Sequence, residues 1–123
     1  MKIAVMGEIH EDGWKVFEDN NLESFELLNF EENNLQKELS EVDAILLRTA
    51  RLSNDVLSFC KKLKIVSRHG VGYDNVNLEY LNQNNIALGI TSTSNAVSVA
   101  EHVLTSFLYL SKNIHLSDKL TRE

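Results

Sequence analysis

Short apolar runs recur along the chain and are separated by polar or mixed segments. The clearest runs are at residues 2–6, 43–47, 63–67 and 86–90, and a more polar run lies at residues 24–28. Apolar runs of this length without polar alternation are typical of strands that are buried on both faces of a parallel sheet. The polar character of residues 24–28 favours an edge position for that strand.

The segments between these runs have the spacing and the caps of helices. Trp14 and Phe17 are three residues apart and share one face of a predicted helix. Ser53 and Asn77 are the predicted N-caps of two shorter helices. Five strand–helix alternations predict an α/β fold, a three-layer sandwich around a five-stranded parallel sheet in the flavodoxin-like or Rossmann-like manner.

A long helix is predicted at residues 96–113, and its apolar side chains spread around most of its circumference. They are Val97, Val99, Ala100, Val103, Leu104, Phe107, Leu108 and Leu110. A surface helix would keep such residues in one stripe. Two interpretations stay open: a central core helix, or a helix that packs against a second domain or a second chain. The tail at residues 115–123 is polar and is a candidate for fraying.

Composition and charge exclude several classes of partner. The chain has 123 residues, of which 43% are hydrophobic and 24% charged, as in ordinary globular domains. Its net charge of −6 argues against binding to nucleic acid or to an anionic membrane surface. No apolar run has the roughly 18 residues of a membrane span, and residues 1–6 are too short for a signal peptide. We therefore expect a cytoplasmic protein.

Metal and disulfide chemistry is not indicated by the cysteine and histidine pattern. Cys60 is the single cysteine, so the chain has no intramolecular disulfide and no cysteine metal cluster. His10, His102 and His115 do not have the spacing of metal ligands. We therefore expect no metal site in this chain.

The most informative stretch lies between the strand at residues 63–67 and the helix that begins after Asn77. It contains Gly70 and Gly72, which flank Val71. Ligands of open α/β sheets bind at the carboxyl ends of strands, and closely spaced glycines let main-chain N–H groups face an anion. The alternative is a tight turn that needs positive φ. A dinucleotide loop is excluded because Asn75 stands where the third glycine is required.

Two arginines support the anion interpretation. Arg48 and Arg68 follow the third and fourth predicted strands, which are neighbours in the flavodoxin-like order. Guanidinium groups suit bidentate binding of carboxylate or phosphate. The alternative for each is a surface ion pair. His69 lacks an evident orienting carboxylate, so we interpret it as a neighbour of the site and not as a catalyst.

Three segments resemble a known family. They are residues 46–50 (LLRTA), residues 63–76 (LKIVSRHGVGYDNV) and residues 94–102 (SNAVSVAEH). Together they are similar to the D-isomer-specific 2-hydroxyacid dehydrogenases, and most to the D-3-phosphoglycerate dehydrogenase branch. The resemblance extends from about residue 43 to residue 113. The loop at Thr91 and Ser92 departs from the family pattern N-T-P.

The resemblance implies an NAD-dependent oxidoreductase with a cleft between two flavodoxin-like or Rossmann-like domains. Within this chain it implies that the amides of Val71 and Gly72 bind the carboxylate of a small 2-hydroxy or 2-oxo acid substrate. It also implies that Arg48 and Arg68 contribute to substrate binding and that Asn95 opens the interdomain helix at the cleft. In the family this helix, here residues 96–114, packs between domains and at a homodimer interface.

The same resemblance implies that part of the enzyme is not in this sequence. The family's G-x-G-x-x-G loop and its catalytic Arg, Glu and His belong to an NAD-binding domain that follows this helix. We therefore expect a substrate-binding domain at residues 1–95, the interdomain or dimerisation helix at residues 96–114 and a tail at residues 115–123. No catalytic or cofactor-binding residue is expected here, and the chain alone is predicted to be inactive. The alternative is a stand-alone small-anion-binding or dimerisation module without catalysis. The particular hydroxyacid, and the choice of NAD or NADP, stay open.

Overall fold

The computed structural model describes all 123 residues, which form two compact units, Met1–Thr91 and Ser92–Glu123. The first unit alternates strands and helices, and the second contains two helices. In chain order the elements are β1 (Lys2–Met6), α1 (Glu11–Asp19), β2 (Glu23–Leu27), α2 (Glu32–Leu39), β3 (Ala44–Leu47), α3 (Asn54–Phe59), β4 (Ile65–Arg68), α4 (Leu78–Gln83), β5 (Ala87–Ile90), α5 (Ala96–Ser111) and α6 (Ile114–Arg122).

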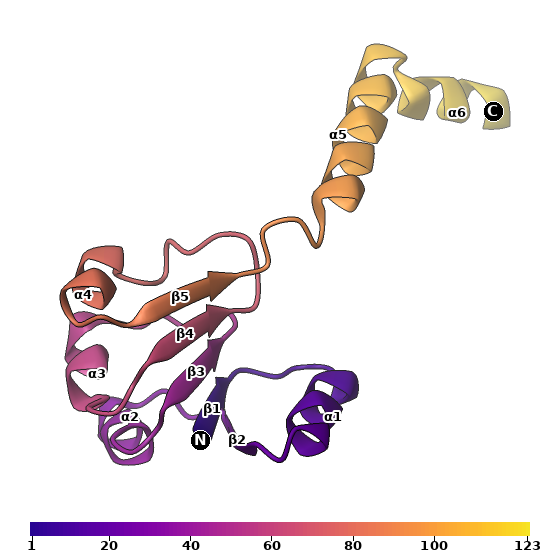
Figure 1. Ribbon diagram of the computed structural model, residues 1–123. Coiled ribbons are helices and arrows are strands. Elements are labelled where there is room, and N and C mark those ends of the chain that lie inside the picture. The colour runs from indigo at the N-terminus through magenta and orange to yellow at the C-terminus, as the bar shows by residue number, and fades with distance from the viewer. The chain divides into compact units, whose positions relative to one another are not determined.

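The five strands form one parallel sheet in the order β2-β1-β3-β4-β5. This is the predicted flavodoxin-like order, and the polar strand β2 lies at an edge, as its composition indicates. Figure 1 shows α2, α3 and α4 along one face of the sheet and α1 on the other, so the first unit has three layers. The predicted α/β fold class is confirmed.

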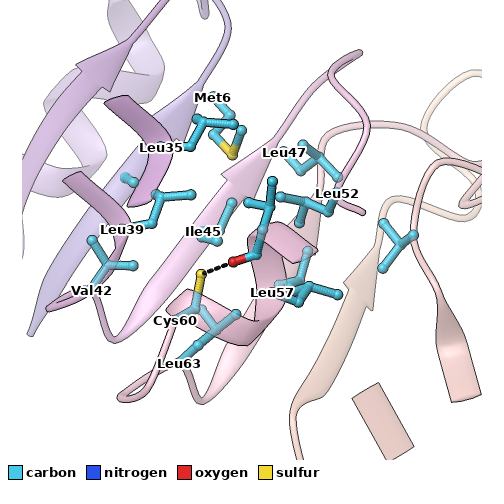
Figure 2. Packing of buried hydrophobic residues seen from close by; sticks show 14 of the residues in the cluster. Met6, Leu35, Leu39, Val42, Ile45, Leu47, Leu52, Leu57, Cys60 and Leu63 are labelled. Carbon is cyan, nitrogen blue, oxygen red and sulfur yellow. Dashed lines mark hydrogen bonds between the residues drawn. The ribbon is translucent and has the colours of Figure 1, made fainter. Parts of the chain in front are cut away.

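The main core lies between the sheet and the layer formed by α2, α3 and α4. Figure 2 shows side chains from both layers pointing toward one another; among those that are almost fully buried are Met6, Leu35, Leu39, Ile45, Leu47 and Leu57. Burial of each such side chain stabilises the fold by about 1.5–3 kcal/mol. Cys60 belongs to this core, and its Sγ–H donates a hydrogen bond to the Val56 carbonyl at 3.3 Å. Burial raises the pKa of the Cys60 thiol to about 11.

Two predicted N-caps are confirmed, and both lie beside the loops at the carboxyl ends of the central strands. Ser53 Oγ accepts the Val56 N–H at 3.3 Å at the start of α3, and Asn77 Oδ1 accepts the Tyr80 N–H at 3.1 Å at the start of α4. Such caps satisfy main-chain donors that have no partner within the helix. They fix the residues at which both loops end.

The second unit consists of α5 and α6. None of the residues of α5 is buried, and Phe107 is 74% exposed. None of the helices in the structure combines the length and the hydropathy that a membrane span requires.

The tail differs from the expectation of fraying, because residues 114–122 form a helix. Asn113 adopts a left-handed conformation (φ 49°) that ends one helix and starts the next. Arg122 Nε then contacts Asp118 Oδ1 at 2.8 Å, and the ion pair of Lys119 and Glu123 has the same four-residue spacing. Pairs at this spacing stabilise a helix locally, and the apolar pattern alone does not reveal them.

Candidate anion site at the carboxyl edge of the sheet

Both candidate arginines lie at the carboxyl edge of the sheet. Leu47, the last residue of β3, pairs with Arg68, the last residue of β4, and Arg48 follows Leu47 directly. The His69 N–H donates to the Leu47 carbonyl at 2.8 Å, so the ladder continues one step beyond β4. The ends of β3 and β4 therefore lie side by side where the glycine stretch begins.

Arg68 extends from the core face of the sheet. It stands in register with Leu47, which in turn pairs with Met6, and both of these side chains belong to the core. The stem of Arg68 is accordingly half-buried, and its Nε is a buried donor without a hydrogen-bond partner. Its Nη1 donates to the His69 carbonyl. A buried unpartnered donor on a charged side chain is uncommon in proteins, and a bound ligand is one of its explanations.

Gly70 makes this position of the guanidinium possible. Its φ is +155°, and a Cβ at this residue would lie 2.5 Å from Arg68 Nη1 and 2.9 Å from Arg68 Cζ. Any other side chain would therefore occupy the space of the guanidinium. The Gly70 carbonyl accepts the Thr91 N–H at 3.2 Å, which ties the turn to the end of β5. Gly70 is therefore both a turn residue and the residue whose missing side chain leaves space for the Arg68 guanidinium.

A shallow hollow of about 220 Å³ opens beside the guanidinium, and we call it the edge hollow. It is lined by Thr49, Arg68, Gly72, Asp74 and Asn75. One wall comes from the loop after β3 and the other from the glycine stretch after β4. The Arg68 guanidinium, which suits a planar anion, thus lines the same small space as Gly72 and the carboxylate residue Asp74.

The family follows from a sequence comparison. The model of the catalytic domain of the D-isomer-specific 2-hydroxyacid dehydrogenases matches residues 3–122. The chain belongs to this family.

Individual relatives agree with this assignment. A D-3-phosphoglycerate dehydrogenase of Archaeoglobus fulgidus is 28% identical over 124 residues, which is 100% of this chain and 24% of that protein. Its counterpart in Mycobacterium tuberculosis H37Rv is 40% identical over 84 residues, 68% of this chain and 16% of that protein. The chain thus spans a quarter or less of the length of these two curated relatives.

Solved structures show the same fold. A protein of Pyrococcus horikoshii OT3 superimposes with a TM-score of 0.86 at 24% identity, over 98% of this chain and 36% of that one. An NAD-dependent formate dehydrogenase of Staphylococcus aureus, solved with NAD, has a TM-score of 0.77 at 28% identity, over 100% of this chain and 42% of that one.

The structure brings together some of the predicted site residues of this dehydrogenase-family chain. Arg68 and Gly72 line the edge hollow, and Val71, the residue before Gly72, is exposed. Arg48 is not among the lining residues; its Nη1 donates to the Glu8 carbonyl at 2.8 Å, beyond the end of β1. Asn95 precedes α5 in the second unit. The roles of all five residues stay predictions.

Sequence reasoning missed Thr49, Asp74 and Asn75 as members of the site. Thr49 lines the edge hollow from the loop after β3. Asn75 lines it from the other side, and its Nδ2 donates to the Ala50 carbonyl at 2.6 Å. The available signal was the D-N-V run that begins at Asp74, which supports the family resemblance but was assigned no part in the site.

The edge hollow does not fit a nicotinamide dinucleotide. Its volume of about 220 Å³ suits a small anion only, and the side chain at the third fingerprint position, Asn75, is engaged with the loop after β3. The turn also does not lead directly into a helix, because α4 begins only at Leu78. A pyrophosphate requires that helix N-terminus.

Proposed function

We propose that this chain is the substrate-binding part of an NAD-dependent D-2-hydroxyacid dehydrogenase similar to phosphoglycerate dehydrogenase, and that the edge hollow binds the substrate carboxylate. The observation that carries the proposal is the juxtaposition of Arg68 and Gly72 in one small hollow at the carboxyl edge of the sheet. Membership of the family and the names of the relatives support the reaction class.

The work of these residues would be binding and orientation. The amides of Val71 and Gly72 would donate to the carboxylate oxygens, and the Arg68 guanidinium would compensate the negative charge. Charge-assisted hydrogen bonds of this kind are each worth about 1.5–3 kcal/mol. A carboxylate held in this way presents the adjacent C2 carbon in a fixed direction, which is the contribution of positioning to catalysis. NAD, when bound elsewhere in the enzyme, supplies the hydride-accepting ring.

Arg48 and Asn95 belong to the same proposal as further substrate contacts. Arg48 lies at the same sheet edge as Arg68, on the next strand. Its guanidinium is exposed and makes its hydrogen bond to a main-chain carbonyl, so its charge is not neutralised by a carboxylate there. It is therefore available to a second anionic group of the substrate. Asn95 would act from the start of α5.

The test is an NMR titration of the 123-residue chain with oxalate and with 3-phosphoglycerate. We expect amide shifts that are largest at Val71 and Gly72. Arg68→Ala should weaken binding about 10- to 100-fold, from the loss of one charge-assisted interaction. The matched control is Arg51→Ala, since Arg51 is an exposed arginine of the neighbouring loop that does not line the edge hollow. Equal effects of the two substitutions, or shifts that avoid the glycine stretch, would contradict the proposal.

We further propose that the chain alone does not turn over substrate, because the residues that act on C2 lie in another domain. Incubation of the 123-residue chain with NADH and a 2-oxo acid should leave the absorbance at 340 nm unchanged. Steady oxidation of NADH that depends on the amount of chain would refute this statement.

A homodimer through α5 completes the proposal. Leu104 and Phe107 are 65% and 74% exposed on this helix, which is costly for large apolar side chains in water. Sedimentation velocity of the 123-residue chain should show a dimer that dissociates in the Leu104→Lys, Phe107→Lys variant. Thr105→Lys, an exposed polar position of the same helix, is the control. A wild-type chain that is monomeric at high concentration would exclude the dimer.

A further inference from the structure

The loops after β3 and β4 are joined by an asparagine whose side chain continues a main-chain ladder. The Asn75 carbonyl accepts the Leu52 N–H at 3.0 Å, and Asn75 Nδ2 donates to the Ala50 carbonyl at 2.6 Å. In a parallel ladder, one residue accepts from the residue after its partner and donates to the residue before it. Asn75 makes this same pair of bonds on either side of Arg51, but the donor is its side-chain amide.

The joint continues beyond Asn75. Leu52 and Val76 form an isolated parallel bridge, and both side chains are buried, at 2% and 7% exposure. One residue further, Asn77 Nδ2 donates to Asn54 Oδ1 at 2.9 Å. The two loops therefore meet along a short seam, and Asn75 lies at the end of it that is nearest the edge hollow.

We propose that Asn75 is a positioning residue that holds the loop carrying Thr49 against the glycine stretch and thereby gives the edge hollow its shape. The segment from Arg48 to Arg51 is fixed at one end by β3, where the Arg48 N–H donates to the Met6 carbonyl at 3.1 Å. At the other end it is fixed by Asn75. Thr49 lies between these two anchors and lines the edge hollow together with Gly72. The importance of the edge hollow for substrate binding rests on the proposed function.

The amide is required by the chemistry of the joint. The Ala50 carbonyl needs a donor, and Asn75 supplies one at a length that reaches across the seam. Alanine would leave this carbonyl without that donor and the loop with one anchor fewer. Aspartate has the same shape, but its carboxylate is an acceptor only and would repel the Ala50 carbonyl. If Asn75 merely added stability, its replacement would lower the folded fraction without changing the anion affinity of the folded molecules.

The experiment compares the 123-residue chain with its Asn75→Ala and Asn77→Ser variants by NMR, first without ligand and then with oxalate and sulfate as probes. Asn77→Ser is the matched control, because it removes the bond to Asn54, keeps an N-cap residue and does not line the edge hollow. In Asn75→Ala we expect exchange of the Leu52 amide to accelerate at least 10-fold and the ligand-free Thr49 resonances to move. Oxalate affinity, determined on the folded signals, should fall about 10-fold. The control should retain both properties.

The outcomes separate this inference from the proposed function. If the wild type binds neither probe at Gly72, the proposed carboxylate site is wrong, and the ligand-free Leu52 and Thr49 data still decide whether Asn75 holds the loop. If affinity falls while those ligand-free signals are unchanged, Asn75 contacts the anion directly and the positioning role is refuted. If neither changes, it is refuted as well.

Should Asn75→Ala not fold, Asn75→Asp serves in its place. Its protonated carboxyl can donate to the Ala50 carbonyl below about pH 4, whereas its carboxylate cannot. In Asn75→Asp, the chemical shifts of Thr49 and Leu52 are compared with those of the wild type at each pH. The differences should become smaller on acidification. Differences from the wild type that do not depend on pH would overturn the proposal.

Discussion

Gly70→Ala is expected to displace a guanidinium without unfolding the protein. The new methyl would lie 2.5 Å from Arg68 Nη1 and 2.9 Å from Cζ, well inside contact distance, and 3.1 Å from Nη2. The guanidinium is the far end of a flexible side chain, so it can swing away, and its hydrogen bond to the His69 carbonyl is then lost. The Arg68 charge remains in the protein but leaves the edge hollow.

The substitution has two separable costs. The backbone cost comes from a φ of +155° at a residue that now carries a Cβ, which is about 1–2 kcal/mol of folding stability. The binding cost is the loss of one charge-assisted interaction of about 1.5–3 kcal/mol. Anion affinity should therefore fall about 10- to 100-fold, while the protein stays folded.

Urea unfolding and oxalate titration of the single and double variants measure these costs. In an Arg68→Ala background, Gly70→Ala should keep its backbone cost but cause no further loss of affinity, because the group it displaces is gone. Gly89→Ala is the matched control: a Cβ there meets only ordinary contacts, at 3.8 Å or more, and its stability should change by less than about 1 kcal/mol. Wild-type oxalate affinity in Gly70→Ala would refute the role assigned to Arg68.

Three further predictions concern stability and reactivity. Leu39→Ala, at a fully buried position of α2, should destabilise the chain by about 2–5 kcal/mol in urea unfolding. The hydrogen bonds from the Lys64 ammonium and the Lys2 N–H lower the pKa of Asp43. The Asp43 carboxylate therefore stabilises the folded chain above its ordinary pKa of about 4, and this stabilisation is lost as the pH falls through the lowered pKa. Asp43→Asn should therefore be less stable than the wild type at pH 7, with a difference that shrinks on acidification. Since burial raises the pKa of Cys60 to about 11, its alkylation by iodoacetamide at pH 8 should be at least 10-fold slower in the native chain than in urea; equal rates would contradict the burial.

Much of the fold was predictable because its signals are local. Strands buried on both faces need continuous apolar runs, and Ser53 and Asn77 cap helices through bonds to residues three positions away. The helix α6 was missed because residues 115–123 were judged by their polar composition, although Leu116 and Leu120 are four residues apart and the ion pair of Asp118 and Arg122 has the same spacing. The joint at Asn75 could not be predicted for another reason: its partner Ala50 is 25 residues away, and only the folded sheet brings the two loops together.

Strand register also refines the relation between the two arginines. Arg68 pairs with Leu47 and shares its core face, whereas Arg48 comes one residue later, and successive residues of an extended chain point to opposite sides. In agreement with this alternation, Arg68 hydrogen-bonds within the glycine stretch after β4. Arg48 hydrogen-bonds to Glu8 in the loop after β1, the strand on the other side of β3. The two guanidinium groups thus approach the sheet edge from different directions. Under the proposed function, this arrangement would place a carboxylate at Arg68 and a second anionic group at Arg48, and not one carboxylate between both arginines.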